Sequence, residues 1–402
     1  IALQDIKSNE LLQDAATTSI YGSRGADGVL LIETHTGKLG KVQFDYQYKN
    51  SMNFQPPPIP MLDGDEYILL QREEWHNAYG VYDRPPEISY DPEFADFYNY
   101  SANTDWLGAI TQNSMTHDHY FKISGGGQKT RYFTSFSYVD EGGTTINTSS
   151  KRFSTRVNLD YYLSRKLLFT IQFNYTNNNR EGNLKLRNEW GGERNVRNMA
   201  YIKAPNMSIW EYDSQGNPTG EYFTPINSYQ GDGQYYYNPV AISDLGKADR
   251  RNNSLENTFR LRYNLNEWIT FRETVTIQFS GEKSQNFLPY NAIGMDWLQW
   301  RINMAEEGNS MNSSVRTETQ LAFDSPFANQ DHVLTGALTW ETNQSQYEWM
   351  NIQSNRTPST DIQDPAIDAQ INWIGTGAGE QRYLGGAANV NYKYKDRYMN
   401  QG

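Results

Sequence analysis

Two histidines are the first candidates for chemistry in this sequence. His117 and His119 are separated by one residue, so a β-strand would place both imidazoles on one face, where they could bind a metal ion. The chain contains only 5 histidines and no cysteine, and no third ligand follows at a regular spacing. We therefore interpret the pair as surface or interfacial histidines and expect no metal site.

A glycine-rich loop and the carboxylates are the next candidates. The loop from Gly22 to Gly28 could cradle a phosphate group, but it lacks the Gly-Lys-Ser/Thr ending and does not lead from a strand into a helix. The 47 acidic residues show no spacing that singles out a catalytic pair, and the sequence shows no nucleophile motif. We expect no enzyme, no catalytic residue and no cofactor. The acidic balance also argues against a nucleic-acid partner.

Aromatic residues gather in one long polar segment, where they favour ligand binding over catalysis. Their rings can stack on sugar rings, and tyrosine hydroxyl groups add directional hydrogen bonds. Packing between loops, or against a covering protein, would explain the same residues. The candidates for ligand contact are Trp190, Trp210, Tyr222, Tyr229, Tyr235, Tyr236 and Tyr237.

The elements that must position these residues are strands with a two-residue period. From Phe153 to Tyr161 apolar residues alternate with polar ones, and about ten segments repeat this pattern near the ~9–11 residues of a tilted spanning strand. If the apolar side chains face lipid, the alternate residues face a lumen. Glu273 is an exception on the apolar face, which a position near a rim or a register shift of one residue would explain. The charged residues that the pattern places in the lumen are Arg156, Asp160, Arg260, Arg262 and Arg272.

Composition is compatible with strands that cross a membrane. Hydrophobic residues make up 37% of the chain and mean hydropathy is -0.79. No apolar run approaches the ~18 residues that a spanning helix requires. Barrel strands alternate lipid-facing and lumen-facing residues, which lowers the hydropathy of each segment. The 29 tyrosines suit the girdles at barrel rims, although soluble β-sandwiches also favour tyrosine.

The connections between strands give the strongest indication of fold. Short turns alternate with long loops, which we expect at residues 53–116, 177–253, 281–312 and 343–380. Soluble domains rarely contain such loops, whereas outer-membrane barrels combine short periplasmic turns with long extracellular loops. In the first loop, Asp63 is expected to cap a helix that runs through Trp75. The sequence therefore predicts an all-β fold, an antiparallel transmembrane β-barrel in contact with outer-membrane lipid.

The first forty residues differ from the rest and indicate a small α/β unit. We expect a helix from Asn9 to Thr17, a tight glycine-rich connection and a buried strand from Val29 to Ile32.

This segment resembles a known signature. Residues 11–32 are similar to the end of the plug domain in SusC/RagA-type TonB-dependent transporters of the Bacteroidetes. The signature residues are Asp14, Ala15, Tyr21, Gly22, Ser23, Arg24, Gly25 and Gly28, while Gln13 and Asp27 replace the usual lysine and asparagine. Further similarities follow in order at Asn103-Thr104-Asp105-Trp106, Ser124-Gly125-Gly126, Asp140-Glu141-Gly142 and Tyr237-Asn238-Pro239-Val240-Ala241.

The resemblance implies a plugged barrel of roughly 22 strands, of which this chain would hold about ten. It implies TonB-dependent import of a large nutrient, a glycan or a peptide, across the bacterial outer membrane. A SusD-like surface lipoprotein would cover the extracellular loops, and TonB would act through a plug segment missing from this chain. Residues 1–40 would form the C-terminal part of the plug, with Arg24 paired inside the barrel wall. Residues 41–402 would form the N-terminal part of the barrel.

Two other functions fit parts of the same pattern. A passive outer-membrane pore or an adhesin barrel would share the strands but would lack the plug-like start. A secreted carbohydrate-binding or hydrolytic β-protein would be soluble without detergent.

Overall fold

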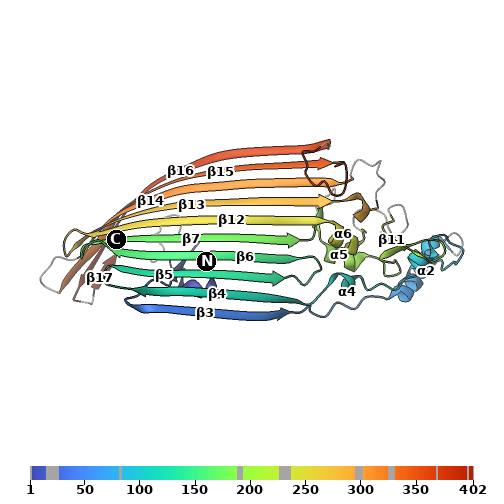
Figure 1. Ribbon diagram of the computed structural model, residues 1–402, viewed down its shortest axis with the longest axis horizontal. Coiled ribbons are helices and arrows are strands. Elements are labelled where there is room, and N and C mark those ends of the chain that lie inside the picture. The colour runs from blue at the N-terminus through green and yellow to red at the C-terminus, as the bar shows by residue number, and fades with distance from the viewer. Residues whose placement is uncertain are drawn as a thin grey trace.

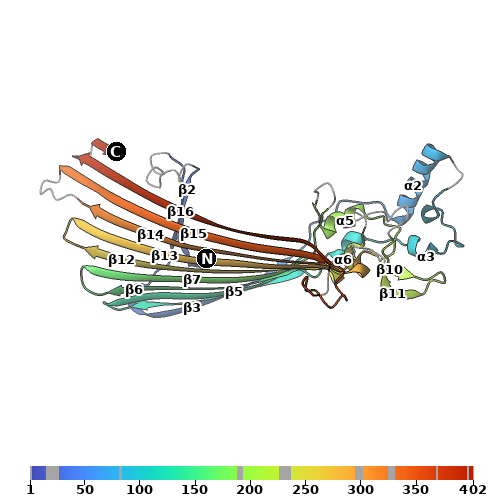
Figure 2. The same cartoon turned by 90° about the horizontal axis from the view of Figure 1, so that it is seen from above.

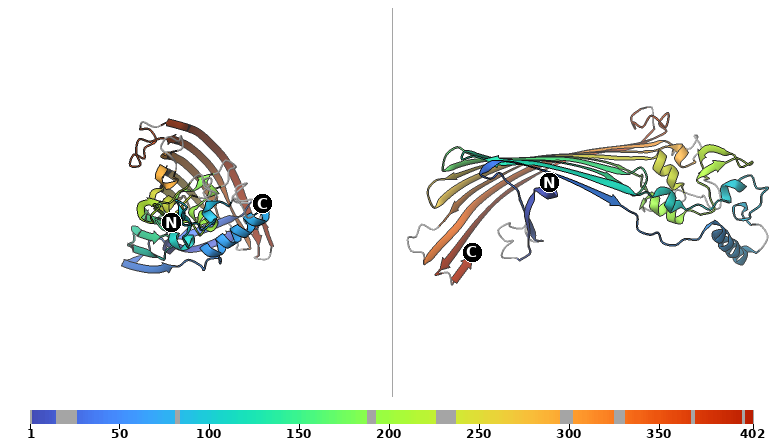
Figure 3. Two further views of the ribbon diagram at one scale, coloured as in Figure 1. Left: turned by 90° about the vertical axis from the view of Figure 1, so that its right-hand side faces the viewer. Right: turned by 60° about the horizontal axis from the view of Figure 1, so that its bottom comes forward.

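Eleven antiparallel strands form one continuous sheet, in which the strand order follows the chain (Figure 1). The computed structural model describes residues 2–14, 27–80, 84–187, 193–225, 237–294, 302–324, 331–367, 370–395 and 398–401. The strands of the sheet are β3 (Gly40–Asn53), β4 (Ser114–Gly126), β5 (Thr130–Gly142), β6 (Ser149–Tyr162), β7 (Leu167–Gly182), β12 (Lys247–Asn264), β13 (Ile269–Leu288), β14 (Met304–Phe323), β15 (His332–Asn355), β16 (Gln370–Tyr394) and β17 (Tyr398–Gln401). The sheet is arched, and the N-terminal segment lies on its concave side (Figure 3). The predicted antiparallel barrel wall is confirmed.

The two faces of the sheet differ in chemistry as the alternation predicts. Arg156 on β6 lies opposite Ser135 on β5 and Asn174 on β7, so polar residues form continuous rows across the concave face. The convex face exposes large apolar side chains, among them Phe44, Phe136, Phe153, Phe279, Val315, Leu338, Trp340 and Leu384. Glu273 keeps its expected register on the convex face, where it lies opposite Thr319 and accepts a hydrogen bond of 2.6 Å from its hydroxyl group.

Strands β13 to β16 are much longer than expected, so the two predicted loops that connect them in pairs are too long. Strands β13 and β14 pair up to Leu288 and Met304, which shortens the loop between them to residues 289–303. Strands β15 and β16 continue to Asn355 and from Gln370, which shortens their loop to residues 356–369. In these extensions the convex face also carries polar residues, such as Gln346 and Glu380. The two-residue hydropathy pattern therefore disappears although the hydrogen-bonded ladder continues.

The N-terminal segment is a hairpin that stands away from the sheet (Figure 2). After the short helix η1 (Leu3–Asp5), β1 (Ile6–Leu12) pairs antiparallel with β2 (Val29–Thr34). The predicted helix is wrong over Asn9–Leu12, because this stretch forms the partner strand of β2; residues 15–17 lie outside the described chain. The predicted strand at Val29–Ile32 is present, but Leu30, Leu31 and Ile32 are exposed rather than buried, because only the base of the hairpin contacts the sheet.

The long loops fold into a layer of their own at one end of the strands (Figure 1). The first helix, α2 (Gly64–Tyr79), begins at a capping box formed by Asp63 and Glu66, as predicted, and extends past Trp75. Within the described residues, no helix is long and apolar enough to span a membrane. The remaining loop elements are η3 (Pro86–Ile88), α3 (Phe97–Tyr100), α4 (Trp106–Ile110), β8 (Leu186–Arg187), β9 (Glu193–Arg194), α5 (Val196–Ile202), β10 (Trp210–Tyr212), β11 (Pro218–Tyr222), α6 (Pro239–Leu245) and η4 (Tyr290–Ala292).

Candidate functional site

The concave face holds the N-terminal segment through a buried carboxylate. Asp5 is buried against the sheet and accepts hydrogen bonds from Tyr120 on β4, at 2.6 Å, and from Ser135 on β5, at 3.0 Å. Nearby, the Gln4 amide donates to Asp118 at 3.1 Å. A buried carboxylate is stable only when such donors replace water. The alternation of polar and apolar residues on β4 and β5 therefore places two hydrogen-bond donors where they can bind Asp5.

The strand that leaves the hairpin is held by a second set of contacts. Arg156 donates a hydrogen bond to Thr34, and the side-chain amide of Asn158 donates to the carbonyl oxygen of His35 at 2.9 Å. At Gly37 the two backbones nearly touch, since a Cβ atom there would lie 2.3 Å from the backbone nitrogen of Tyr132. Only glycine fits at this position.

Beyond these contacts the concave face opens into a cavity of about 940 Å³. Thr36 lines it from the N-terminal segment, and residues of β6 through β15 line it from the sheet. Four of the five charged residues expected in the lumen belong to this lining, namely Asp160, Arg260, Arg262 and Arg272. The fifth, Arg156, contacts the N-terminal segment instead. Residues far apart in the sequence thus line one polar cavity.

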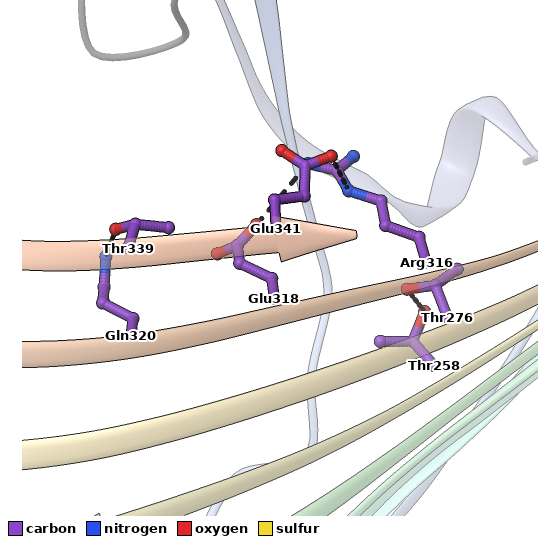
Figure 4. A network of polar contacts seen from close by, with 7 residues as sticks. All are labelled: Thr258, Thr276, Arg316, Glu318, Gln320, Thr339 and Glu341. Carbon is purple, nitrogen blue, oxygen red and sulfur yellow. Dashed lines mark hydrogen bonds and ion pairs between the residues drawn. The ribbon is translucent and has the colours of Figure 1, made fainter. Parts of the chain in front are cut away.

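The concave face also holds an ionic network beside the cavity, and its residues were not among the site residues expected from the sequence. Arg316 on β14 forms ion pairs with Glu341 on β15, at 2.9 Å, and with Glu318, at 3.5 Å (Figure 4). Gln320 donates to Thr339 at 3.4 Å. The spacing Arg316-x-Glu318 places both residues on one face of a strand, which could have predicted this ion pair from the sequence. The sequence gives no indication that Glu341 lies beside Arg316.

At the other end of the sheet the loops share a hydrophobic core. Trp106 and Met207 are buried in this core, and the indole nitrogen of Trp106 donates to the carbonyl oxygen of Ala204 at 2.9 Å. Asn238 is fully buried and caps α6, since its side-chain oxygen accepts from the backbone nitrogens of Val240 and Ala241. Two of the sequence motifs singled out above, those that contain Trp106 and Asn238, therefore contribute buried contacts to the loop layer.

A lysine is buried in the same core. Lys203 is only 4% exposed, and its ammonium group lies 6.0 Å from the centre of the Trp106 ring. Burial disfavours the charged form and lowers the pKa of Lys203 to about 7.

Several known proteins are similar to this chain over much of its length. The chain is 24% identical over 404 residues to TonB-dependent receptor P3 of Formosa agariphila, which covers 99% of this chain and 37% of that protein. It is 28% identical over 242 residues to TonB-dependent receptor SusC of Bacteroides thetaiotaomicron, covering 58% of this chain and 22% of that protein. A solved structure, the RagAB peptide importer in its 'closed-closed' state, superposes with a TM-score of 0.74 over 99% of this chain and 46% of that chain, at 18% identity. The chain is SusC/RagA-like.

The SusC/RagA-like chain spans about a third of the length of the Formosa receptor. No family model matches it.

Two residues of the SusC/RagA-like signature fall within the described chain. Asp14 follows β1, and Gly28 precedes β2 with a φ of 101°, the positive value expected for this connection. The other signature residues, Ala15, Tyr21, Gly22, Ser23, Arg24 and Gly25, lie outside the described residues.

The loop aromatics divide into three groups. Trp210 and Tyr222 face each other across the β10–β11 hairpin, with ring centres 4.4 Å apart. Trp210 also lines a pocket of about 360 Å³ together with Tyr98. Tyr237 is buried in the loop core, so its ring is not available to a solute. The remaining candidates, Trp190, Tyr229, Tyr235 and Tyr236, lie outside the described residues.

The two histidines lie on the convex face. Tyr48 is hydrogen bonded to Nδ1 of His117 and Tyr46 to Nδ1 of His119, each at 2.8 Å. Each imidazole is thus engaged with a tyrosine of the neighbouring strand.

Proposed function

We propose that the whole protein is a TonB-dependent importer of a large nutrient, a glycan or a peptide, in the bacterial outer membrane. The observation that carries this proposal is that Asp5 of the N-terminal segment is hydrogen bonded to the polar concave face of the sheet, while the convex face is apolar. An apolar convex face can contact lipid, as the outside of a membrane barrel does. A polar concave face that binds a segment of the same chain is typical of a barrel whose lumen is closed by a plug. The SusC and Formosa relatives support the same function.

In this proposal residues 1–40 are the end of a plug and residues 41–402 are part of the barrel wall. The contacts of Asp5, Thr34 and His35 then fix the plug to the wall, and TonB would act on plug residues beyond this chain. The charged residues Asp160, Arg260, Arg262 and Arg272 would line the passage beside the plug.

The loop layer would receive the solute and the partner. Trp210 and Tyr222 are the predicted loop aromatics that we retain as ligand contacts, because Trp210 is exposed and lines a pocket. A SusD-like lipoprotein would close over the same loops.

Uptake with and without the inner-membrane energy transducer tests the proposal. The full-length protein is expressed in otherwise identical strains, and labelled oligosaccharide and peptide pools are recovered from the periplasm and analysed by mass spectrometry. We expect accumulation only when the transducer is present. Equal accumulation in both strains would indicate a passive pore, and purification of the protein without detergent would indicate a secreted β-protein.

A further inference from the structure

Four aromatic side chains form a row on the concave face of β15 and β16. Tyr383 lies opposite Asn343, which lines the cavity, and Tyr347 and Trp349 follow Asn343 on the same face at two-residue steps along β15. Trp373 on β16 occupies the same face, since two-residue steps along β16 connect it to Tyr383. We call these residues the aromatic row; it extends the cavity lining toward the loops.

Each ring of the aromatic row lies against a glycine. A Cβ atom at Gly377 would lie 2.3 Å from Nε1 of Trp349, and one at Gly375 would lie 2.4 Å from the Trp373 ring. A Cβ atom would likewise lie 2.3 Å from Tyr347 at Gly379 and 2.3 Å from Tyr383 at Gly385. Glycine at alternate positions of β16 therefore creates space in which the rings lie flat on the backbone.

Rings that lie on the backbone have one covered face and one open face. All four side chains are between 40% and 50% exposed, as expected when one side is covered. Trp349 and Trp373 are nearly parallel, with an angle of 16° between their planes and 6.5 Å between their centres. From Gly375 to Gly385 the row spans about 33 Å, at ~3.3 Å per residue. The row is thus an extended stacking surface rather than a single pocket.

The neighbours of the row indicate what it binds. Asn312 lies opposite Tyr347 and Ser310 opposite Trp349, so hydroxyl and amide groups flank the rings. The ion pair of Arg316 and Glu341 lies beside the Tyr383 end of the row, since Asn343 lies between Arg316 and Tyr383 and Glu341 lies opposite Gly385. Apolar ring faces beside hydroxyl and amide groups match the faces and hydroxyl groups of a sugar chain. The carboxylates of Glu282, opposite Ser310, and of Glu306, opposite Gln353, lie on the same face and disfavour an anionic chain. A peptide that binds by strand addition would need a free strand edge for backbone pairing, which the face of a sheet does not offer.

We propose that the aromatic row binds an extended neutral glycan by stacking, as it passes from the loops toward the cavity. This proposal rests on the proposed import function for its place in the path, but binding itself requires no energy source. The site and the transport function can therefore fail separately.

Binding of a neutral glycan array to the full-length protein in detergent tests the site. One variant, Trp349→Ala, removes a ring, and a second, Gly377→Ala, keeps the ring but inserts a methyl group beneath it. The matched controls are Trp268→Ala, an exposed tryptophan at the turn end, and Gly386→Ala, where a Cβ atom would lie 3.4 Å from Trp340 on the convex face. Thermal unfolding of each variant separates lost binding from lost folding.

We expect wild type to bind at least one neutral glycan and both site variants to weaken that binding about fivefold, while the controls do not. Absence of any neutral glycan bound by wild type would overturn the proposal, as would site variants that bind as well as the controls. Preferential retention of a neutral hexapeptide pool over all glycans would also overturn it. Loss of uptake without the energy transducer bears only on the import function.

Discussion

The carboxylate of Asp5 and the hydroxyl group of Tyr120 are joined by a hydrogen bond of 2.6 Å, although the two residues lie 115 positions apart in the chain. Asp5 belongs to the N-terminal segment and Tyr120 to the sheet. The hydrogen bond therefore contributes to the free energy that holds the N-terminal segment on the sheet.

Removing the Tyr120 hydroxyl group should loosen the N-terminal segment. Tyr120→Phe leaves the buried Asp5 carboxylate with Ser135 as its remaining side-chain donor, which costs about 1–3 kcal/mol. Hydrogen exchange of residues 2–14 in the full-length protein should speed up accordingly. Tyr138→Phe, on the convex face, is the matched control and should leave this exchange unchanged. Equal exchange in both variants would show that Asp5 does not hold the segment.

Adding a methyl group at Gly37 should displace the same segment by a different route. A Cβ atom there meets the backbone of Arg131 and Tyr132, which cannot move without breaking the β5 ladder. Gly37→Ala should therefore increase proteolysis within residues 27–40, whereas Gly127→Ala, where a Cβ atom meets nothing within 4 Å, should not. Unchanged proteolysis in Gly37→Ala would contradict the close approach.

Two adjacent residues of β13 test which face meets lipid. Ile277 lies on the convex face and Gln278 lines the cavity. Arginine at position 277 should destabilise folding into lipid vesicles by about 2–4 kcal/mol, whereas arginine at position 278 should be tolerated. The measurement is denaturant unfolding of Ile277→Arg and Gln278→Arg in vesicles. If Gln278→Arg were the more damaging change, the assignment of the faces would be reversed.

The buried lysine predicts a pH dependence of the loop core. Burial lowers the pKa of Lys203 to about 7 from its ordinary value of 10.5, so between these values the unfolded loop binds a proton that the folded loop has released. Stability of the core should therefore rise with pH from about 7 to 10 and level off below 7, with each tenfold change in proton affinity worth about 1.4 kcal/mol. Hydrogen exchange around Trp106, corrected for intrinsic rates, measures this slope. In Lys203→Met the slope should vanish; its persistence would assign the effect to another group.

The sequence predicts the wall of the sheet well because each strand near the turns has one apolar face. The alternation at Phe153–Tyr161 placed Arg156 and Asp160 on the concave face, where they lie. The capping box at Asp63 was predicted for a similar reason, since it depends on residues three positions apart.

Prediction failed where both faces of a strand are polar or where a partner is distant. The extensions of β15 and β16 look like loops in the sequence, so Trp349 and Trp373 were assigned to no element. The alternate glycines at 375, 377 and 379 were the signal that could have revealed a strand. Pairing of β1 with β2 brings distant residues together, and local helical preference over Asn9–Leu12 gave no information about it.

Strand length has a consequence for where a solute is handled. β16 contains 25 residues, whereas a tilted strand needs only about 9–11 to cross a bilayer. At ~3.3 Å per residue and a tilt of ~40°, β16 rises about 60 Å, against an apolar belt about 25 Å tall. In the proposed orientation more than half of β16 would extend above the membrane surface into water, whereas β4, with 13 residues, would extend only a few ångströms beyond the apolar belt. A molecule arriving from outside would be guided by protein for some distance before it reached the depth of the membrane.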